Sequence, residues 1–366
     1  MHSEQQLQNP GPSDGTTAHG AASESIRERL VVALFLLYSA VSFFLIQYDR
    51  MRTAGAGLDI WIHLKLSRSA ILTDGDQYRI ALPLLMHFLQ LHAHLRPYQS
   101  LPLIEFVCYA FALTLLYLLF RCSPQIQNAP YSHRLVVLGL FLTAAQFPIL
   151  WIFPWERPET LPTTFYLAAV VLLIVRRSRM PFALVCLFVI LLTVAQALTR
   201  ADVPVVVGVA TLLAAAMAIP FPRPRSHIAI LGLLCGAVGG ATQCYLHHIF
   251  PIAAPSQTTS EFQLFANLNL LYPPLHIPVF LTALLPLIVS VVLLRRYRLP
   301  LDSSDKLVLL ACLVYLALWI TFGLVAEVRI FVPFLFLASP TIAKLWTAFL
   351  FNQGAGAHSS PSPSLR

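Results

Sequence analysis

Long apolar segments separated by short polar connections run through most of this chain. Ten of these segments are long enough to be membrane-crossing helices, which need about 20 mostly apolar residues. Their approximate limits are 30–47, 102–120, 135–153, 161–175, 180–198, 203–219, 228–246, 277–294, 307–325 and 330–350. The pattern predicts an all-α, polytopic integral membrane protein of about ten transmembrane helices.

The two ends of the chain differ from this apolar region. Residues 1–28 are rich in Ser, Gly, Gln and Thr, and residues 351–366 also lack an apolar core. We expect two disordered cytoplasmic tails around one transmembrane domain over residues 29–350. The first apolar segment follows Arg27 and Arg29 and has no small-residue cleavage site after it, which predicts a retained signal anchor.

Composition supports the membrane interpretation. Of the residues, 57% are hydrophobic and 11% are charged, and the mean hydropathy is +0.72. Soluble domains carry about 25% charged residues, so a soluble globule is excluded. Six cysteines without a framework spacing also exclude a disulfide scaffold.

The net charge of +8 is distributed along the chain as a topology signal. Every predicted connection on one side carries at least two Lys or Arg, and every short connection on the other side carries at most one. Because cytoplasmic connections are enriched in basic residues, both termini are predicted to be cytoplasmic, in a membrane of the bacterial inner (plasma) membrane type. The dispersed charges disfavour a nucleic-acid partner, which needs basic residues gathered on one module.

The connections on the predicted outer side combine acids with arginines, and each of these arginines is followed by a proline one to five residues later. Proline favours the first turn of a helix, so helix amino ends with unpaired N–H groups should face outward there. Arginine adds a fork of donors that matches phosphate oxygens. The residues that form this set are Tyr78, Arg79, Arg157, Glu159, Arg200, Asp202, Glu327 and Arg329. They predict a phosphate or diphosphate site at the outer edge of the bilayer.

The long outer loop, residues 48–101, contains two further apolar stretches. Residues 60–72 mix apolar and basic positions, which predicts an amphipathic helix in the membrane interface with Asp59 at its amino end. Residues 80–91 predict a second interfacial helix. A second long outer loop, 247–276, is expected to form a partly ordered cover over the site.

Small residues predict how two helices pack. Gly232, Gly236 and Gly240 follow one another at intervals of four within one predicted span. This spacing lets a neighbouring helix approach closely, and we expect helix packing there and no ligand site. The six cysteines lie mostly within spans and are expected to be small apolar packing residues.

The outer-side residues resemble those of GT-C-type polytopic membrane glycosyltransferases. The likeness rests on an Asp after the first span, on Tyr78-Arg79-Ile80-Ala81-Leu82-Pro83, and on Arg157-Pro158-Glu159, Arg200-Ala201-Asp202 and Glu327-Val328-Arg329. It implies a mannosyltransferase-like transfer of a hexose or pentose from a polyprenyl-phosphate-linked donor. The acceptor would be a glycan, lipid or protein on the non-cytoplasmic face, and the reaction would serve the cell envelope.

The resemblance also implies roles for individual residues. An acid of the first outer loop activates the acceptor hydroxyl; Asp59 matches it best by position, and Asp49 and Asp76 are competitors. This chain departs from the family's pattern, because Ile-Trp-Ile-His follows Asp59 where an acid pair with a nearby Tyr is common. The donor phosphate would be held by Arg79, Arg157, Arg200 and Arg329, while Glu159, Asp202 and Glu327 would orient these arginines or bind the sugar.

No cofactor is expected. His92, His94 and the pair at 247–248 lack the spacing of a dedicated metal site, so a divalent metal is only a secondary expectation. Two other functions stay open: a secondary transporter and a non-catalytic assembly protein of envelope glycan biosynthesis. Against a transporter, only Glu105 and Lys344 are charged residues within predicted spans, both near span ends.

Overall fold

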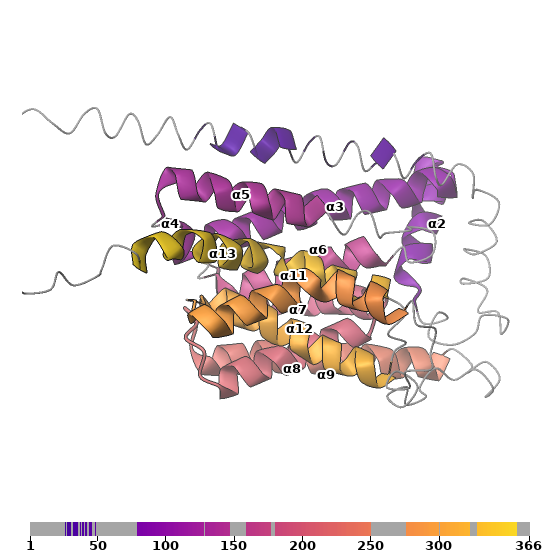
Figure 1. Cartoon of the computed structure of the whole chain (residues 1–366). Helices are drawn as coiled ribbons and strands as arrows, with labels where there is room; N and C mark the ends of the chain where they lie inside the picture. Colours follow the sequence, from indigo (N-terminus) through magenta and orange to yellow (C-terminus); the bar gives the residue numbers. More distant parts are fainter. Residues whose placement is uncertain are drawn as a thin grey trace, which may run out of the picture.

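The computed structural model shows a bundle of helices (Figure 1). The structure describes residues 79–127, 129–146, 159–176, 180–249, 276–299, 301–322 and 328–356, together with scattered positions between 26 and 48. These residues contain no strand. The predicted all-α class is therefore confirmed over the described part of the chain.

The long helices coincide with the apolar segments predicted from residue 102 onward. In chain order they are α3 (Pro97–Arg121), α5 (Tyr131–Gln146), α6 (Thr160–Val175), α7 (Phe182–Ala197), α8 (Asp202–Ala216), α9 (Arg225–Ile249), α11 (His276–Tyr297), α12 (Ser303–Phe322) and α13 (Val332–Gly356). Three shorter elements are α2 (Ala81–Ala93), α4 (Pro124–Gln127) and the 3₁₀ helix η4 (Val328–Phe331). The segment at 30–47 is helical at each of its described positions.

Among the described residues, four helices are long and apolar enough to cross a membrane: α3, α9, α12 and α13. The outward surface of the bundle has the same character, because several large apolar side chains on it are at least half exposed. Examples are Leu187, Leu191, Leu233 and Leu313. Soluble proteins rarely expose extended apolar surface, whereas contact with lipid chains favours it. The structure thus supports a helical membrane protein.

The lengthwise helices alternate in direction, so the chain returns repeatedly to each end of the bundle (Figure 1). The α2 end holds α2, η4 and the starts of α6, α8 and α13. The α4 end holds α4, the starts of α7, α9 and α12, and the end of α13. One hydrogen bond joins neighbouring connections at each end: the backbone N–H of Ala81 donates to Leu198 O at 3.0 Å at the α2 end, and the Ser123 hydroxyl donates to the Asp302 side chain at the α4 end.

Four helices at the α2 end begin just before a proline. Pro83, Pro162 and Pro204 are the third residues of α2, α6 and α8, and Pro333 is the second residue of α13. Proline fits the first turn because the N–H that it lacks would have no intrahelical partner there. The predicted helix starts at this end are therefore confirmed.

The stretch at 80–91 forms α2, which lies across the end of the bundle (Figure 1). Its Leu82 and Met86 are buried with Leu101 and Ile104 of α3. Four other large apolar side chains of α2 are more than 40% exposed: Leu84, Leu85, Phe88 and Leu91. This exposed apolar side suits a helix at a membrane surface. The helix predicted at 60–72 lies outside the described residues, and so does almost all of the predicted cover at 247–276. Of both predicted tails, only a few positions next to the bundle are described.

Helices α8 and α9 approach closely through glycines. A Cβ atom at Gly208 would lie 2.8 Å from the Gly232 oxygen and 2.8 Å from the Gly236 nitrogen. The predicted packing role of Gly232 and Gly236 is thus confirmed. The third contact is at Gly239, where a Cβ would lie 2.7 Å from Pro204 Cβ, whereas a Cβ at Gly240 would meet nothing within 4 Å. Seven residues make almost two full helical turns, so 239, and not 240, returns to the face of 232.

Candidate functional site

Two arginine–carboxylate pairs lie at the α2 end of the bundle. Arg79, just before α2, places Nη1 2.6 Å from Oε1 of Glu159, the residue that precedes α6. Arg200, between α7 and α8, places Nη2 2.5 Å from Oδ2 of Asp202, the first residue of α8. The fold therefore brings four of the predicted site residues into two ion pairs at one end.

Arg200 connects three parts of the bundle. Its Nε donates to Oδ1 of Asp202 at 3.2 Å, and its Nη1 donates to the backbone oxygen of Ile330 in η4 at 3.3 Å. Its Nη2 also donates to the hydroxyl of Tyr315 on α12, which in turn donates to Ile330 O at 3.3 Å. The Arg200 side chain is only 7% exposed, and its contacts connect the start of α8 to α12 and to η4.

Arg200 keeps its charge in this buried position. Burial by itself lowers the pKa of the guanidinium, but the nearby charge and hydrogen bonds of Asp202, together with the Tyr315 oxygen, raise the pKa above its ordinary value. The carboxylate of Glu159 acts in the same direction. The two ion pairs therefore form one electrostatic cluster, named the α2-end cluster and made of Arg79, Glu159, Arg200 and Asp202.

The two arginines differ in what they can reach. The Arg79 side chain is 30% exposed, whereas nearly all N–H donors of Arg200 are directed at Asp202, Tyr315 and Ile330. A phosphate group that approaches the α2 end can thus meet Arg79 while the contacts of Arg200 stay intact. The Asp202 side chain is 36% exposed, so its carboxylate is also accessible from the α2 end.

A third carboxylate lies near Glu159. Glu105, on α3, is 1% exposed and close enough to Glu159 for the two carboxyl groups to repel each other when ionised, and its Oε2 has no hydrogen-bond partner among the described residues. A buried unpaired acceptor costs about 1–3 kcal/mol, and ionisable groups inside membrane helices commonly mark working sites. From the sequence, Glu105 is recognisable only as a charged residue within a predicted span. The signal that identifies it is an acid about two turns inside an otherwise apolar helix.

Other predicted site residues lie outside the described residues, and their roles stay predictions: Asp49, Asp59, Asp76, Tyr78, Arg157 and Glu327. Arg329 belongs to η4 and directly precedes Ile330, so its backbone lies beside Arg200. Tyr315 was missed by sequence analysis, because a tyrosine inside an apolar helix carries no local signal of an arginine partner.

In the part of the chain that the structure describes, no three His, Cys, Asp or Glu side chains are grouped so that they could hold a metal ion.

A separate ion-pair network lies toward the α4 end. Lys344 of α13 places Nζ 2.5 Å from Oδ1 of Asp305 and 3.6 Å from Oδ2 of Asp302, and its side chain is 4% exposed. The Thr341 hydroxyl donates to Asp305 Oδ1 at 2.7 Å, and the Ser123 hydroxyl donates to Asp302 Oδ2. The network thus joins the end of α3 and the start of α12 to the middle of α13.

Comparisons with known proteins supply no relative for this chain. No protein-family model, no curated protein and no solved structure matches it. The chemistry of the α2-end cluster is therefore inferred from its own residues and from their place in the bundle.

Proposed function

We propose that the chain is a membrane glycosyltransferase that moves a sugar from a polyprenyl-phosphate-linked donor to an acceptor on the non-cytoplasmic face. The observation that carries the proposal is the α2-end cluster, in which residues from separate connections meet at one end of an apolar bundle. Arginines placed in advance stabilise a departing phosphate. The end of a membrane helix also lies at the depth where a lipid places its phosphate.

Sugar transfer to a hydroxyl needs a base and a group that receives negative charge. The acceptor oxygen bonds to the anomeric carbon and gives its proton to a carboxylate. The bond between that carbon and the phosphate oxygen breaks, and its electron pair stays on the phosphate. Asp59 is the proposed base, with Asp49 and Asp76 as alternatives, and such a base contributes about 10²- to 10⁴-fold to the rate.

The arginines divide the remaining work. Arg79, held by Glu159 and partly exposed, is proposed to bind the departing phosphate together with Arg157 and Arg329. Arg200 is proposed to contribute its charge to the same phosphate and, through Ile330, to fix the position of η4 and hence of the backbone at Arg329. Glu327 and the exposed carboxylate of Asp202 are proposed to bind sugar hydroxyls or orient the arginines, and Tyr78 to line the same site.

The orientation that this function requires is also a proposal: about ten spans, both termini in the cytoplasm and the α2 end outside. Its support is the position of the basic residues. Eight of them lie in or next to helix ends at the α4 end: Arg121, Arg134, Arg176, Arg223, Arg225, Arg295, Arg296 and Lys306. The positive-inside rule favours the cytoplasm for that end.

A secondary transporter is the second candidate, and one observation favours it. Lys344, Asp305 and Asp302 form an ion-pair network among helices of the bundle, where Lys344 and Asp305 are each 4% exposed. Charges inside membrane proteins frequently line ion or proton pathways.

The fate of the donor distinguishes the two candidates. Purified protein in vesicles is incubated with a panel of polyprenyl-phosphate sugars and acceptors, and released polyprenyl phosphate is measured. We expect release with at least one donor, and a loss of about 10²-fold in Arg79→Gln, which removes one phosphate-binding cation. Arg225→Gln, which changes an exposed arginine at the α4 end, is the matched control and should keep full activity. No release across the panel, combined with uptake of a sugar or ion into vesicles, would overturn the proposal in favour of transport.

A further inference from the structure

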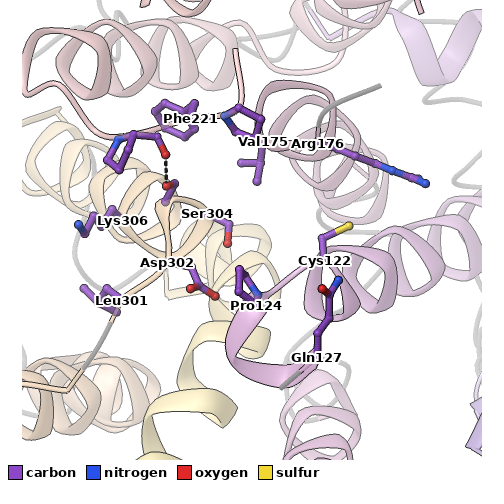
Figure 2. Close-up of a pocket in the computed structure, with 13 residues that line it drawn as sticks. Cys122, Pro124, Gln127, Val175, Arg176, Phe221, Leu301, Asp302, Ser304 and Lys306 are labelled. Carbon is purple, nitrogen blue, oxygen red and sulfur yellow. Dashed lines mark hydrogen bonds between the residues drawn. The ribbon is translucent and has the colours of Figure 1, made fainter. Parts of the chain in front are cut away.

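A pocket of about 620 Å³ opens at the α4 end, opposite the α2-end cluster (Figure 2). It lies where the ends of α3 and α6, the short helix α4, residues 220–222 after α8 and the start of α12 meet. Sites for small ligands have volumes of about 300–1,000 Å³, so this pocket can hold a small molecule or a lipid headgroup.

One side of the pocket offers hydrogen-bond acceptors. The carboxylate of Asp302 and the hydroxyl of Ser304 point into the space beside Pro124 (Figure 2). Oδ2 of Asp302 is occupied by Ser123 and lies near Lys344, but Oδ1 has no partner among the described residues. A carboxylate oxygen that is open to a pocket favours a donor with positive charge.

The rim of the pocket carries two cations. Arg176 and Lys306 are exposed and extend outward from the rim (Figure 2). Neither forms an ion pair with an acid in the described part of the chain. Their long side chains can therefore turn to a phosphate group at the mouth.

The charge pattern selects a class of ligand. A simple anion would meet the Asp302 carboxylate inside the pocket, and a simple cation would meet Arg176 and Lys306 at the mouth. A ligand with an inner ammonium and an outer phosphate satisfies both ends. Val175, Phe221 and Leu301 also line the pocket and add apolar surface, which suits the carbon chain of such a ligand.

We propose that the pocket binds a phosphate ester that carries a primary ammonium group, with the ammonium at Asp302 Oδ1 and Ser304 and the phosphate at Arg176 and Lys306. The α4 end of an apolar bundle lies at headgroup depth, so the nearest source of this chemistry is a phosphatidylethanolamine-type lipid, and a soluble aminoalkyl phosphate is the other source. A quaternary ammonium lacks N–H donors for Oδ1 and should bind less well.

The proposal is tested on the full chain in detergent by native mass spectrometry, with phosphatidylethanolamine, phosphatidylcholine and phosphatidylglycerol as probes. We expect phosphatidylethanolamine to bind about tenfold more tightly than either other lipid, the value of about one charge-assisted hydrogen bond. The double variant R176Q/K306Q removes the two cations assigned to the phosphate, which all three lipids share, so it should weaken phosphatidylethanolamine binding about tenfold or more. Arg225→Gln removes another exposed cation at the same end but outside the pocket lining, and should keep both the affinity and the lipid preference of the unsubstituted protein.

Each alternative result has a definite meaning. Equal affinity for the three lipids, tightest binding of phosphatidylglycerol, or unchanged affinity for phosphatidylethanolamine in R176Q/K306Q would each overturn the proposal. Asp302→Asn removes the charge assigned to the ammonium and should reduce the preference for phosphatidylethanolamine; because Asp302 contacts Lys344, a variant that does not fold leaves the decision to the ranking of the three lipids and to R176Q/K306Q. Soluble phosphoethanolamine that displaces the lipid identifies a soluble ligand as the source, and failure to displace it identifies the lipid.

Discussion

Removing the charge of Asp202 should destabilise the α2 end, because it leaves Arg200 buried without its main partner. The Arg200 side chain is 7% exposed and forms two hydrogen bonds with the Asp202 carboxylate, at 2.5 and 3.2 Å. Loss of one partner from a buried ion pair costs about 3–5 kcal/mol. Asp202 is 36% exposed, and Tyr315 and Ile330 retain their contacts with Arg200, so we expect a smaller loss of unfolding free energy in Asp202→Asn, about 2 kcal/mol.

Tyr315→Phe is the companion variant. It removes the hydroxyl that contacts Arg200 but keeps the ring, whose centroid lies 4.0 Å from that of Phe334. A hydrogen bond to a charged group is worth about 1.5–3 kcal/mol. Because Asp202 and Tyr315 both act through Arg200, the effects of the two substitutions should not add, and the double variant should show a coupling of at least about 0.5 kcal/mol.

The assay is unfolding of the purified protein by titration with a denaturing detergent, followed by intrinsic fluorescence. Arg225→Gln, at an exposed position of the α4 end, is the control and should stay within about 0.5 kcal/mol of the unsubstituted protein. If Asp202→Asn also stays within that range, Arg200 is not held in a buried ion pair and the organisation of the α2-end cluster described above is wrong.

Three further substitutions test the packing and charge of the bundle in the same unfolding assay. Gly208→Ala should lower the unfolding free energy by about 1–3 kcal/mol, because its Cβ would press on α9. Gly240→Ala has open space around its Cβ, so its unfolding free energy should stay the same or rise by up to about 1 kcal/mol. The reverse order would contradict the α8–α9 packing. Lys344→Met should cost about 3–5 kcal/mol because it leaves two carboxylates together, and adding Asp305→Asn should restore part of the loss; purely additive losses would show that the pair is not coupled. Glu105→Met replaces a buried carboxyl group, whose Oε2 has no hydrogen-bond partner among the described residues, by an apolar side chain of similar length. The unfolding free energy should therefore rise by about 1 kcal/mol, and a clear fall would refute the description of Glu105 as unsatisfied.

The fold was largely predictable because its signals are local. A helix that faces lipid is apolar along most of its length, so hydropathy alone located the segments that contain α3, α5 to α9 and α11 to α13. The prolines near Arg79, Arg200 and Arg329 located helix starts in the same way, because the missing N–H of proline is tolerated only in the first turn or at a kink.

The partners within the site were not predictable, because they depend on tertiary packing. Glu159 contacts Arg79 across 80 residues of sequence, although its neighbour in the chain is Arg157. Tyr315 lies inside an apolar helix and reaches Arg200 only because α12 packs beside α8. The third close contact of α9 with α8 is at Gly239 and not at the expected Gly240, because seven residues after Gly232, and not eight, almost complete two helical turns.

Release of polyprenyl phosphate from a polyprenyl-phosphate-linked sugar, measured as a function of donor concentration, tests the proposed function most directly. The unsubstituted protein should release it with an acceptor present, and Arg79→Gln should lower kcat/KM by about 10²-fold. Arg79→Gln should also lose about 1–2 kcal/mol of unfolding free energy, because buried Glu159 loses its cation, so both proteins are assayed where the unfolding titration shows them fully folded. Equal kcat/KM for the unsubstituted protein and Arg79→Gln, or no release with any donor of a broad panel, would contradict a phosphate-binding glycosyltransferase site at the α2 end.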